Sequence, residues 1–260
     1  NGGGVMVRLA GENQVSGEFI FGHRGGVVDM YGHNLTLNAI THLDSGAVFA
    51  NYLDNSTVTL TFTGSGEQTF LGSLRDGEAA SRGLMNVVYA PGTAEGSVWN
   101  LAGHILNTGT WTVQGGEVKV AGVHTLHAGG YVDENDWQMA SFSTGTVQVN
   151  SGARFTTGGH SLVVSAVQVD DGGTYGVLAG GNHSGNVVLS GTASMFRAEV
   201  DSGSATESGV ISGAGSLVKT GEGTLLLKNG NNSFSGTARV EVGMVRASSA
   251  GALGQAVWSL

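Results

Sequence analysis

VQVNSGARF (residues 147–155) returns twenty positions later as VQVDDGGTY (residues 167–175). Both stretches open with Val-Gln-Val, carry a glycine at the same place, and end in an aromatic residue, Phe155 or Tyr175. A twenty-residue period is too short for a four-stranded propeller blade, but it fits one coil of a β-solenoid. In that fold each coil lays short strands on those of the previous coil, about 4.8 Å away. The repeat therefore predicts stacked coils in which Phe155 lies beside Tyr175.

Short β-rich runs bounded by Gly, Asn, Asp or Ser continue this pattern along the chain. In TVTLTF (57–62), Val58, Leu60 and Phe62 alternate with threonines, which places one row of side chains inward and the other outward. Helical periodicity is nearly missing, and residues 74–85, the best candidate helix, contain two glycines and no apolar stripe. We therefore predict an all-β solenoid of about 20–25 residues per coil. A β-sandwich of hairpins is the alternative, although Asn-Gly and Asp-Gly hairpin signals are few.

The composition agrees with a solenoid and excludes several partners. Of 260 residues 46 are glycine, one is proline and 12% are charged, and the net charge is −9. Glycine and asparagine tolerate positive φ and suit the corners between short strands. The eleven basic residues are scattered, which argues against nucleic acid as a partner. Cysteine is absent and no apolar run reaches 18 residues, so we expect neither disulfides nor a transmembrane helix.

The densest group of metal-ligand residue types is a single glycine-rich segment. Its members are His124, His127, Asp133, Glu134 and Asp136. A zinc site needs three or four convergent ligands, and nothing in this segment fixes such convergence. We therefore predict a solvated loop there, with no metal and no cofactor.

Catalytic motifs are equally weak. No G-x-S-x-G nucleophile elbow occurs. The carboxylate pairs Asp170/Asp171 and Glu199/Asp201 would suit glycoside cleavage only at a defined separation, which the sequence does not fix. We accordingly predict no catalytic residue, and polysaccharide cleavage remains a third alternative.

Two segments are predicted to project from the coils as loops, residues 74–97 and 127–142. Insertions in a solenoid emerge on one face and often carry binding residues. We therefore take Tyr131, Asp133 and Trp137 as a candidate partner-binding loop.

Three longer blocks follow one another in a fixed order: FGHRGGVVDMYGHNLTLNAITHLDSGAVFAN (21–51), ENDWQMASF (134–142) and GSLVKTGEGTLLLKNGNNSFSGTARVEVGMVRASSAGALG (215–254). Together they resemble the secreted autotransporter passengers of Gram-negative bacteria, most closely the IgA-protease and Enterobacteriaceae serine-protease type. The third block is similar to the passenger-associated repeat of that family. The residues that carry the resemblance are Phe21, Arg24, Gly25, Gly26, Asp29, Gly32, Asp136, Trp137, Gly221, Gly223, Leu225, Gly236 and Gly243.

The resemblance implies a right-handed parallel β-helix with a stem over residues 1–212. It implies that residues 213–260 form the passenger-associated repeat and begin an autochaperone-like region. Export would be type V secretion through a downstream outer-membrane β-barrel of the same precursor, leaving a virulence factor secreted or at the cell surface. The fragment would act as a rigid spacer and as a C-terminal folding nucleus.

The family's GDSGS protease block is absent, so we expect no enzyme in this fragment and a serine protease domain upstream of it. The alternative function is adhesion or self-association, in which the rod binds host glycans, host proteins or like passengers. The polar stretch NSTVTLTFT (55–63) points that way. Finally, Arg24 and Asp29 are predicted to form an ion pair that fixes the register between coils.

Overall fold

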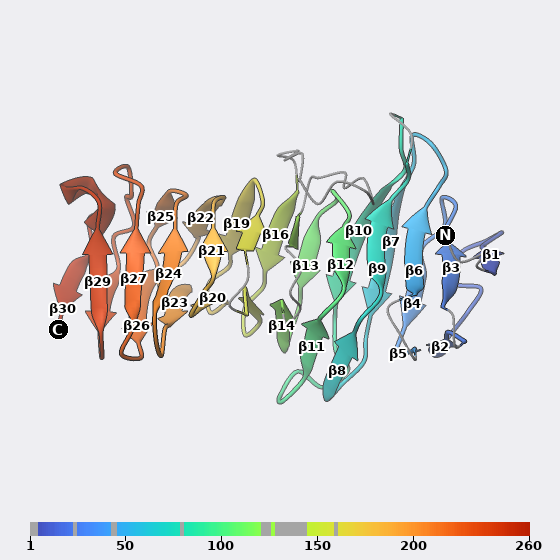
Figure 1. Ribbon diagram of the computed structural model, residues 1–260, viewed down its shortest axis with the longest axis horizontal. Helices are drawn as coiled ribbons and strands as arrows, with labels where there is room; N and C mark the ends of the chain where they lie inside the picture. Colours follow the sequence, from blue (N-terminus) through green and yellow to red (C-terminus); the bar gives the residue numbers. More distant parts are fainter. Residues whose placement is uncertain are drawn as a thin grey trace.

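The computed structural model describes residues 5–22, 25–42, 46–78, 81–120, 126–127, 145–158 and 161–260. It confirms an all-β solenoid, with one 3-10 turn, η1 (Ala250–Leu253), and otherwise strands. Figure 1 shows the strands stacked in chain order along the long axis, with the two termini at opposite ends. Among the described residues every strand pairing is parallel, which is what successive coils of a solenoid require.

The strands form long sheets that run along the rod. The eight-stranded sheet contains β4 (Leu35–Leu37), β7 (Thr57–Phe62), β10 (Leu84–Tyr89), β13 (Trp111–Val113), β16 (Thr146–Val149), β19 (Ala166–Val169), β22 (Asn186–Leu189) and β25 (Ile211–Gly213). The nine-stranded sheet contains β8 (Glu67–Phe70), β11 (Val98–Leu101), β14 (Glu117–Val120), β17 (Arg154–Thr156), β20 (Thr174–Leu178), β23 (Met195–Glu199), β26 (Ser216–Thr220), β28 (Thr237–Val240) and β30 (Val257–Ser259).

The remaining strands complete the coils. The five-stranded sheet contains β1 (Met6–Arg8), β3 (Gly26–Asp29), β6 (Ala47–Asn51), β9 (Ser73–Asp76) and β12 (His104–Leu106). The six-stranded sheet contains β15 (Leu126–His127), β18 (Ser161–Val163), β21 (Asn182–His183), β24 (Ser204–Glu207), β27 (Thr224–Leu227) and β29 (Met244–Ala247). A two-stranded sheet pairs β2 (Glu18–Ile20) with β5 (Ala39–Thr41).

The twenty-residue repeat is confirmed residue by residue. Val147 pairs with Val167, and Phe155 pairs with Tyr175. The two aromatic rings stack with their centroids 6.3 Å apart. Identical positions of consecutive coils therefore lie in one column, as the period predicts.

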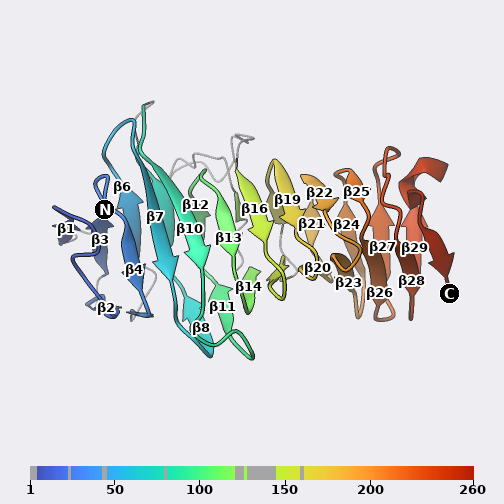
Figure 2. The same cartoon turned by 180° about the vertical axis from the view of Figure 1, so that it is seen from behind.

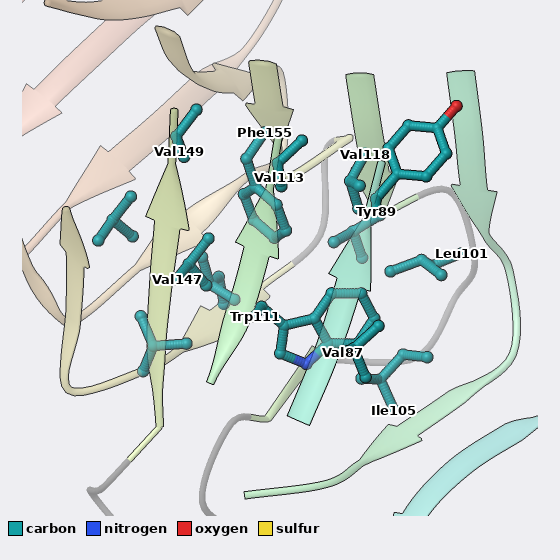
Figure 3. Close-up of a cluster of buried hydrophobic side chains, with 14 of the residues drawn as sticks. Val87, Tyr89, Leu101, Ile105, Trp111, Val113, Val118, Val147, Val149 and Phe155 are labelled. Carbon is teal, nitrogen blue, oxygen red and sulfur yellow. The ribbon is translucent and has the colours of Figure 1, made fainter. Parts of the chain in front are cut away.

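Apolar side chains fill the space between the sheets. Trp111 and Tyr89, both fully buried, point into this interior in Figure 3. The rings of Trp99 and Trp111 lie 6.0 Å apart and those of Phe62 and Trp99 lie 4.7 Å apart, so aromatic contacts cross from one sheet to another. The core is one continuous column along the rod rather than a single central cluster.

The predicted projecting loop at residues 74–97 is wrong over much of its length. Leu74 in β9 and all of β10 are strand, because the alternation of buried Met85, Val87 and Tyr89 continues the inward row. The connection from β9 to β10 does project, together with the connection from β6 to β7 (Figure 1). Asn55 N–H donates to Ser81 O there (2.7 Å), so the two connections support each other.

Coil length is regular only in the C-terminal half. Glu117 pairs with Arg154, thirty-seven residues later, which exceeds the predicted range of 20–25. Beyond Arg154 the nine-stranded sheet returns every 20 or 21 residues, at Thr174, Met195 and Ser216. The predicted boundary between residues 212 and 213 falls inside β25, and stacking continues on both sides of it.

We predict that Phe155→Ala costs about 3–5 kcal/mol of unfolding free energy, because it opens a cavity in the stacked column. Tyr175→Phe should be neutral or stabilising, since the buried Tyr175 hydroxyl has no hydrogen-bond partner among the described residues. Guanidinium unfolding of both variants checks this. Equal losses for the two would contradict the stacking argument.

Candidate functional site

The N-terminal family motif has a structural role. Phe21 is buried, and its ring lies 4.9 Å from that of Phe19 and 5.4 Å from that of Phe49. Gly25 has φ +69°, and a Cβ there would lie 2.0 Å from the carbonyl oxygen of Gly46 in the next coil. Only glycine permits that backbone conformation together with such close stacking.

Asp29 is fully buried and joins three coils. Its Oδ2 accepts a hydrogen bond from Arg8 Nε (2.8 Å), while its Oδ1 accepts from the backbone N–H groups of Tyr31 (3.1 Å) and Tyr52 (3.0 Å). Arg24, its predicted partner, lies outside the described residues. The ionic partner that the structure places on Asp29 is therefore Arg8, half of whose side chain is exposed.

Buried polar side chains beside Asp29 continue this corner along the rod. Asn51 pairs in register with Asp76, and its Oδ1 accepts from Gly32 N–H (3.1 Å) while its Nδ2 donates to Leu84 O (3.0 Å). Asp76 accepts from the N–H groups of Met85 and Thr108 (both 2.8 Å). These side chains satisfy backbone groups that the corner leaves unpaired.

The candidate ion pair therefore belongs to a larger polar column that the sequence motifs did not reveal. The column contains Asp29, Asn51, Asp76 and Asn107, all buried. Desolvation raises the pKa of Asp76 above its usual range, with the hydrogen bonds from Thr108 and Met85 offsetting part of that effect. Asn107 Oδ1 accepts from Trp111 Nε1 (3.1 Å), which ties the column to the aromatic core.

The C-terminal family motif also serves stacking. Leu225 is fully buried and pairs with Ala205 on one side and Val245 on the other. A Cβ on Gly243, whose φ is +82°, would lie 2.3 Å from Gly221 O in the preceding coil. The glycines Gly221, Gly223, Gly236 and Gly243 all approach backbone or buried atoms of the preceding coil so closely that a Cβ would overlap them.

Lys219 provides the one charged group buried in this C-terminal region. Its Nζ donates to Thr220 O and Gly221 O (both 2.6 Å) and to Val242 O (3.2 Å). Burial lowers the pKa of Lys219, while the nearby carboxylate of Asp201 acts in the opposite direction. The lysine thus holds the glycine turn of one coil against the next.

A fully buried His–Glu pair lies further along the same interior. Glu207 Oε2 lies 2.6 Å from His183 Nδ1, and its Oε1 accepts from Gly209 N–H (2.8 Å). Burial raises the pKa of Glu207, and the contacts with His183 and Gly209 offset part of the rise. His183 Nε2 has no partner among the described residues, and the Tyr175 ring lies edge-on to the imidazole at 5.1 Å.

The acidic pair Glu199/Asp201 lines an open hollow of about 480 Å³ on the nine-stranded sheet, with Gly158 and Thr220. Glu199 is already engaged, because it bonds to Arg154 and to Arg197, whose Nε lies 2.6 Å from its Oε1. Burial raises the pKa of Glu199, but the two arginines outweigh it and lower the pKa overall. A carboxylate held in its charged form by two cations is poorly suited to donate a proton to a leaving group.

The outer face of the eight-stranded sheet differs from the others in charge. Its strands contain no Asp, Glu, Lys, Arg or His, whereas the nine-stranded sheet carries Glu117, Arg154, Arg197 and Glu199 among others. Figure 2 shows β7, β10, β13, β16 and β19 side by side along this face.

Asp136, Trp137, Tyr131 and Asp133, the predicted loop residues, lie outside the described residues, as do His124 and Glu134. In the part of the chain that the structure describes, no three His, Cys, Asp or Glu side chains converge as metal ligands. Within the same residues, no helix is long and apolar enough to cross a membrane.

An uninterrupted stack of parallel coils with a ladder-like core defines the class of protein as a β-solenoid. Residues 83–177 match the family described as the PIC/HAP1/IgA0 second beta-solenoid repeat region. A relative in Haemophilus influenzae, the adhesion and penetration protein autotransporter, is 27% identical over 165 residues. These matches support an autotransporter passenger domain of this type and confirm the family resemblance of the sequence motifs.

The match to the relative covers 56% of this chain but only 12% of the relative's own length. No solved structure matches the chain.

We predict that Glu207→Gln flattens the dependence of stability on pH. The folded state of the natural chain binds a proton at Glu207 more tightly than the unfolded state, whose carboxyl pKa is about 4.3. The contribution of this group is therefore full below about pH 4 and is lost as pH rises through the raised folded pKa. Chemical unfolding at a series of pH values measures it.

The exposed Glu222→Gln is the matched control for that series, because it removes one carboxyl group without touching a buried contact. Stability that falls with rising pH by the same amount in Glu207→Gln as in Glu222→Gln would contradict the assignment.

Proposed function

We propose that this chain acts as a rigid β-solenoid spacer of an exported autotransporter passenger, and that its C-terminal coils form the folding nucleus. The passenger would be secreted or displayed at the cell surface after passing through the outer-membrane β-barrel of the same precursor. The observation that carries the proposal is the regular stacking beyond Arg154, where coil follows coil every 20 or 21 residues in the nine-stranded sheet.

Short, equal coils favour early folding for a physical reason. Closing a longer loop costs more conformational entropy, and contacts between residues close in sequence form faster. The N-terminal half contains steps such as Glu67 to Val98 and Glu117 to Arg154, which are longer than any step in the C-terminal half of that sheet. The regular half should therefore fold first.

The C-terminal half also has the interior needed for a nucleus. Leu217, Leu225, Leu227 and Phe234 are fully buried in consecutive segments. Each finished coil presents a row of unpaired backbone groups to the next, so a folded C-terminal coil offers a template for its N-terminal neighbour. Stepwise addition outside the cell would drive export without ATP, because each added coil lowers the free energy of the emerged chain.

A second candidate function is adhesion. The relative is named for adhesion and penetration, and one long face of the rod lacks charged side chains. A rigid spacer and an adhesive face are compatible in one rod, so the two proposals do not exclude each other.

We predict that Leu225→Ala delays folding of the exported passenger, whereas Leu35→Ala does not. Both leucines are fully buried in strands, so each truncation should cost a similar 2–5 kcal/mol or about that. They differ in position, since Leu225 lies in the regular C-terminal half and Leu35 near the other end of the rod (Figure 1). Pulse-chase labelling with external protease, fused to a functional barrel, follows the appearance of resistant passenger.

Native-state hydrogen exchange on the isolated chain gives an independent measurement. We expect the slowest amides in residues 215–246, because the nucleus should be the last part to open. A maximum of protection in residues 21–62, or equal delays in Leu225→Ala and Leu35→Ala, would remove the nucleus from this end of the rod.

A further inference from the structure

We propose that the outer face of the eight-stranded sheet binds an uncharged, hydroxyl-rich polysaccharide that lies along the rod. The inference rests on the second candidate function, adhesion, and names the surface and the chemical class of its ligand.

Strand register places outward polar side chains in columns on this face. One column runs through Thr36, Thr61, Val88, Thr112, Gln148, Gln168, Val188 and Ser212. Its members are at least partly exposed, and consecutive members lie about 4.8 Å apart, the spacing between paired strands. Hydroxyl, amide and small apolar groups thus recur at a fixed interval.

Asparagine side chains beside this column are fixed in orientation. The Oδ1 of Asn34 accepts from Thr59 N–H (2.7 Å), and that of Asn86 accepts from Thr110 N–H (2.8 Å). Asn186 does the same with Val210 N–H (3.1 Å). With each carbonyl engaged, the NH₂ groups of these three asparagines keep their donors available on the surface, and no such bond to them is formed within the described residues. Side chains held in this way lose little entropy when a ligand binds.

The absence of charge on these strands decides between ligand classes. A nucleic acid needs basic side chains, which these strands lack. A protein partner is usually held by exposed aromatic, Met or Arg side chains, whereas the aromatic and Met side chains of β7, β10 and β13 are Phe62, Met85, Tyr89 and Trp111, all buried. An anionic polymer would be repelled by the net charge of −9, with no cation on this face to offset it.

An uncharged polysaccharide matches what remains. Its hydroxyl groups both donate and accept, as do threonine hydroxyls and asparagine and glutamine amides. Apolar faces of sugar rings can lie on Val88 and Val188, which are half-buried in the same column. An extended polysaccharide repeats its groups once per sugar ring, so that weak contacts on successive coils add up along one chain.

The test uses the purified chain with cellulose, chitin, mannan and a β-1,3-glucan, all uncharged, and with polygalacturonate as the charged comparison. We expect saturable binding to at least one uncharged polymer and none to polygalacturonate. Thr112→Glu, which adds a charge to the middle of the column, should weaken binding about tenfold or more. Thr206→Glu, the same change at a partly exposed strand position of the six-stranded sheet, should leave binding within about twofold.

Circular dichroism melting shows whether both variants are folded. Should Thr112→Glu fail to fold, Gln168→Glu, which is nearly isosteric, takes its place. No binding to any uncharged polymer, or equal losses in the face variant and Thr206→Glu, overturns the proposal. Self-association of the natural chain in sedimentation velocity that is abolished by the face variant also overturns it, since the face would then join two copies.

Cells that display the passenger separate the ligand from the function. Adhesion to a polysaccharide-coated surface that the face variant retains would keep adhesion and remove this face as its cause. Adhesion that the variant loses, with Thr206→Glu unaffected, supports both.

Discussion

Hydrogen bonding between parallel strands of successive coils is the constraint on which the rest of this structure depends. Each backbone group in a strand finds its partner about twenty residues away, so no coil can satisfy its own strands. The interior must then repeat in step with the backbone, which is why Phe155 stacks on Tyr175 and Leu225 lies between Ala205 and Val245. A coil without neighbours has neither paired strands nor a core, so stability belongs to the stack.

Corners are the second demand of this geometry, and two different solutions appear along the rod. In the N-terminal half, the buried side chains of Asp29, Asn51 and Asp76 accept hydrogen bonds from backbone groups of adjoining turns. In the C-terminal half, glycines such as Gly243 let the turns themselves approach, and Lys219 binds their carbonyls. The first solution buries carboxylates and raises the pKa of Asp76, while the second relies on backbone contact.

The sequence predicts those features that repeat visibly and misses those that depend on full register. The Val147/Val167 pairing follows from identical residues at a fixed offset, and the alternation in residues 57–62 fixes its inward row. Residues 74–97 were wrongly predicted as a loop because their coil is longer than the period, which hides β10. The His183–Glu207 pair joins unlike residues twenty-four positions apart, and no local pattern aligns them. The Arg8–Asp29 bond likewise joins a motif residue to one outside every motif.

Register also explains why charge can be sorted among the faces of the rod. A side chain two positions further along a strand stays on the same face, and the equivalent residue of the next coil lies directly beside it. Like charges at neighbouring coils would therefore repel along a whole column, so charged groups occur where partners alternate, as in the contacts of Arg154 and Arg197 with Glu199. The eight-stranded sheet avoids that problem with hydroxyl and amide side chains. A surface that needs no ion pairs to be stable is also one that a neutral polymer can cover without displacing any.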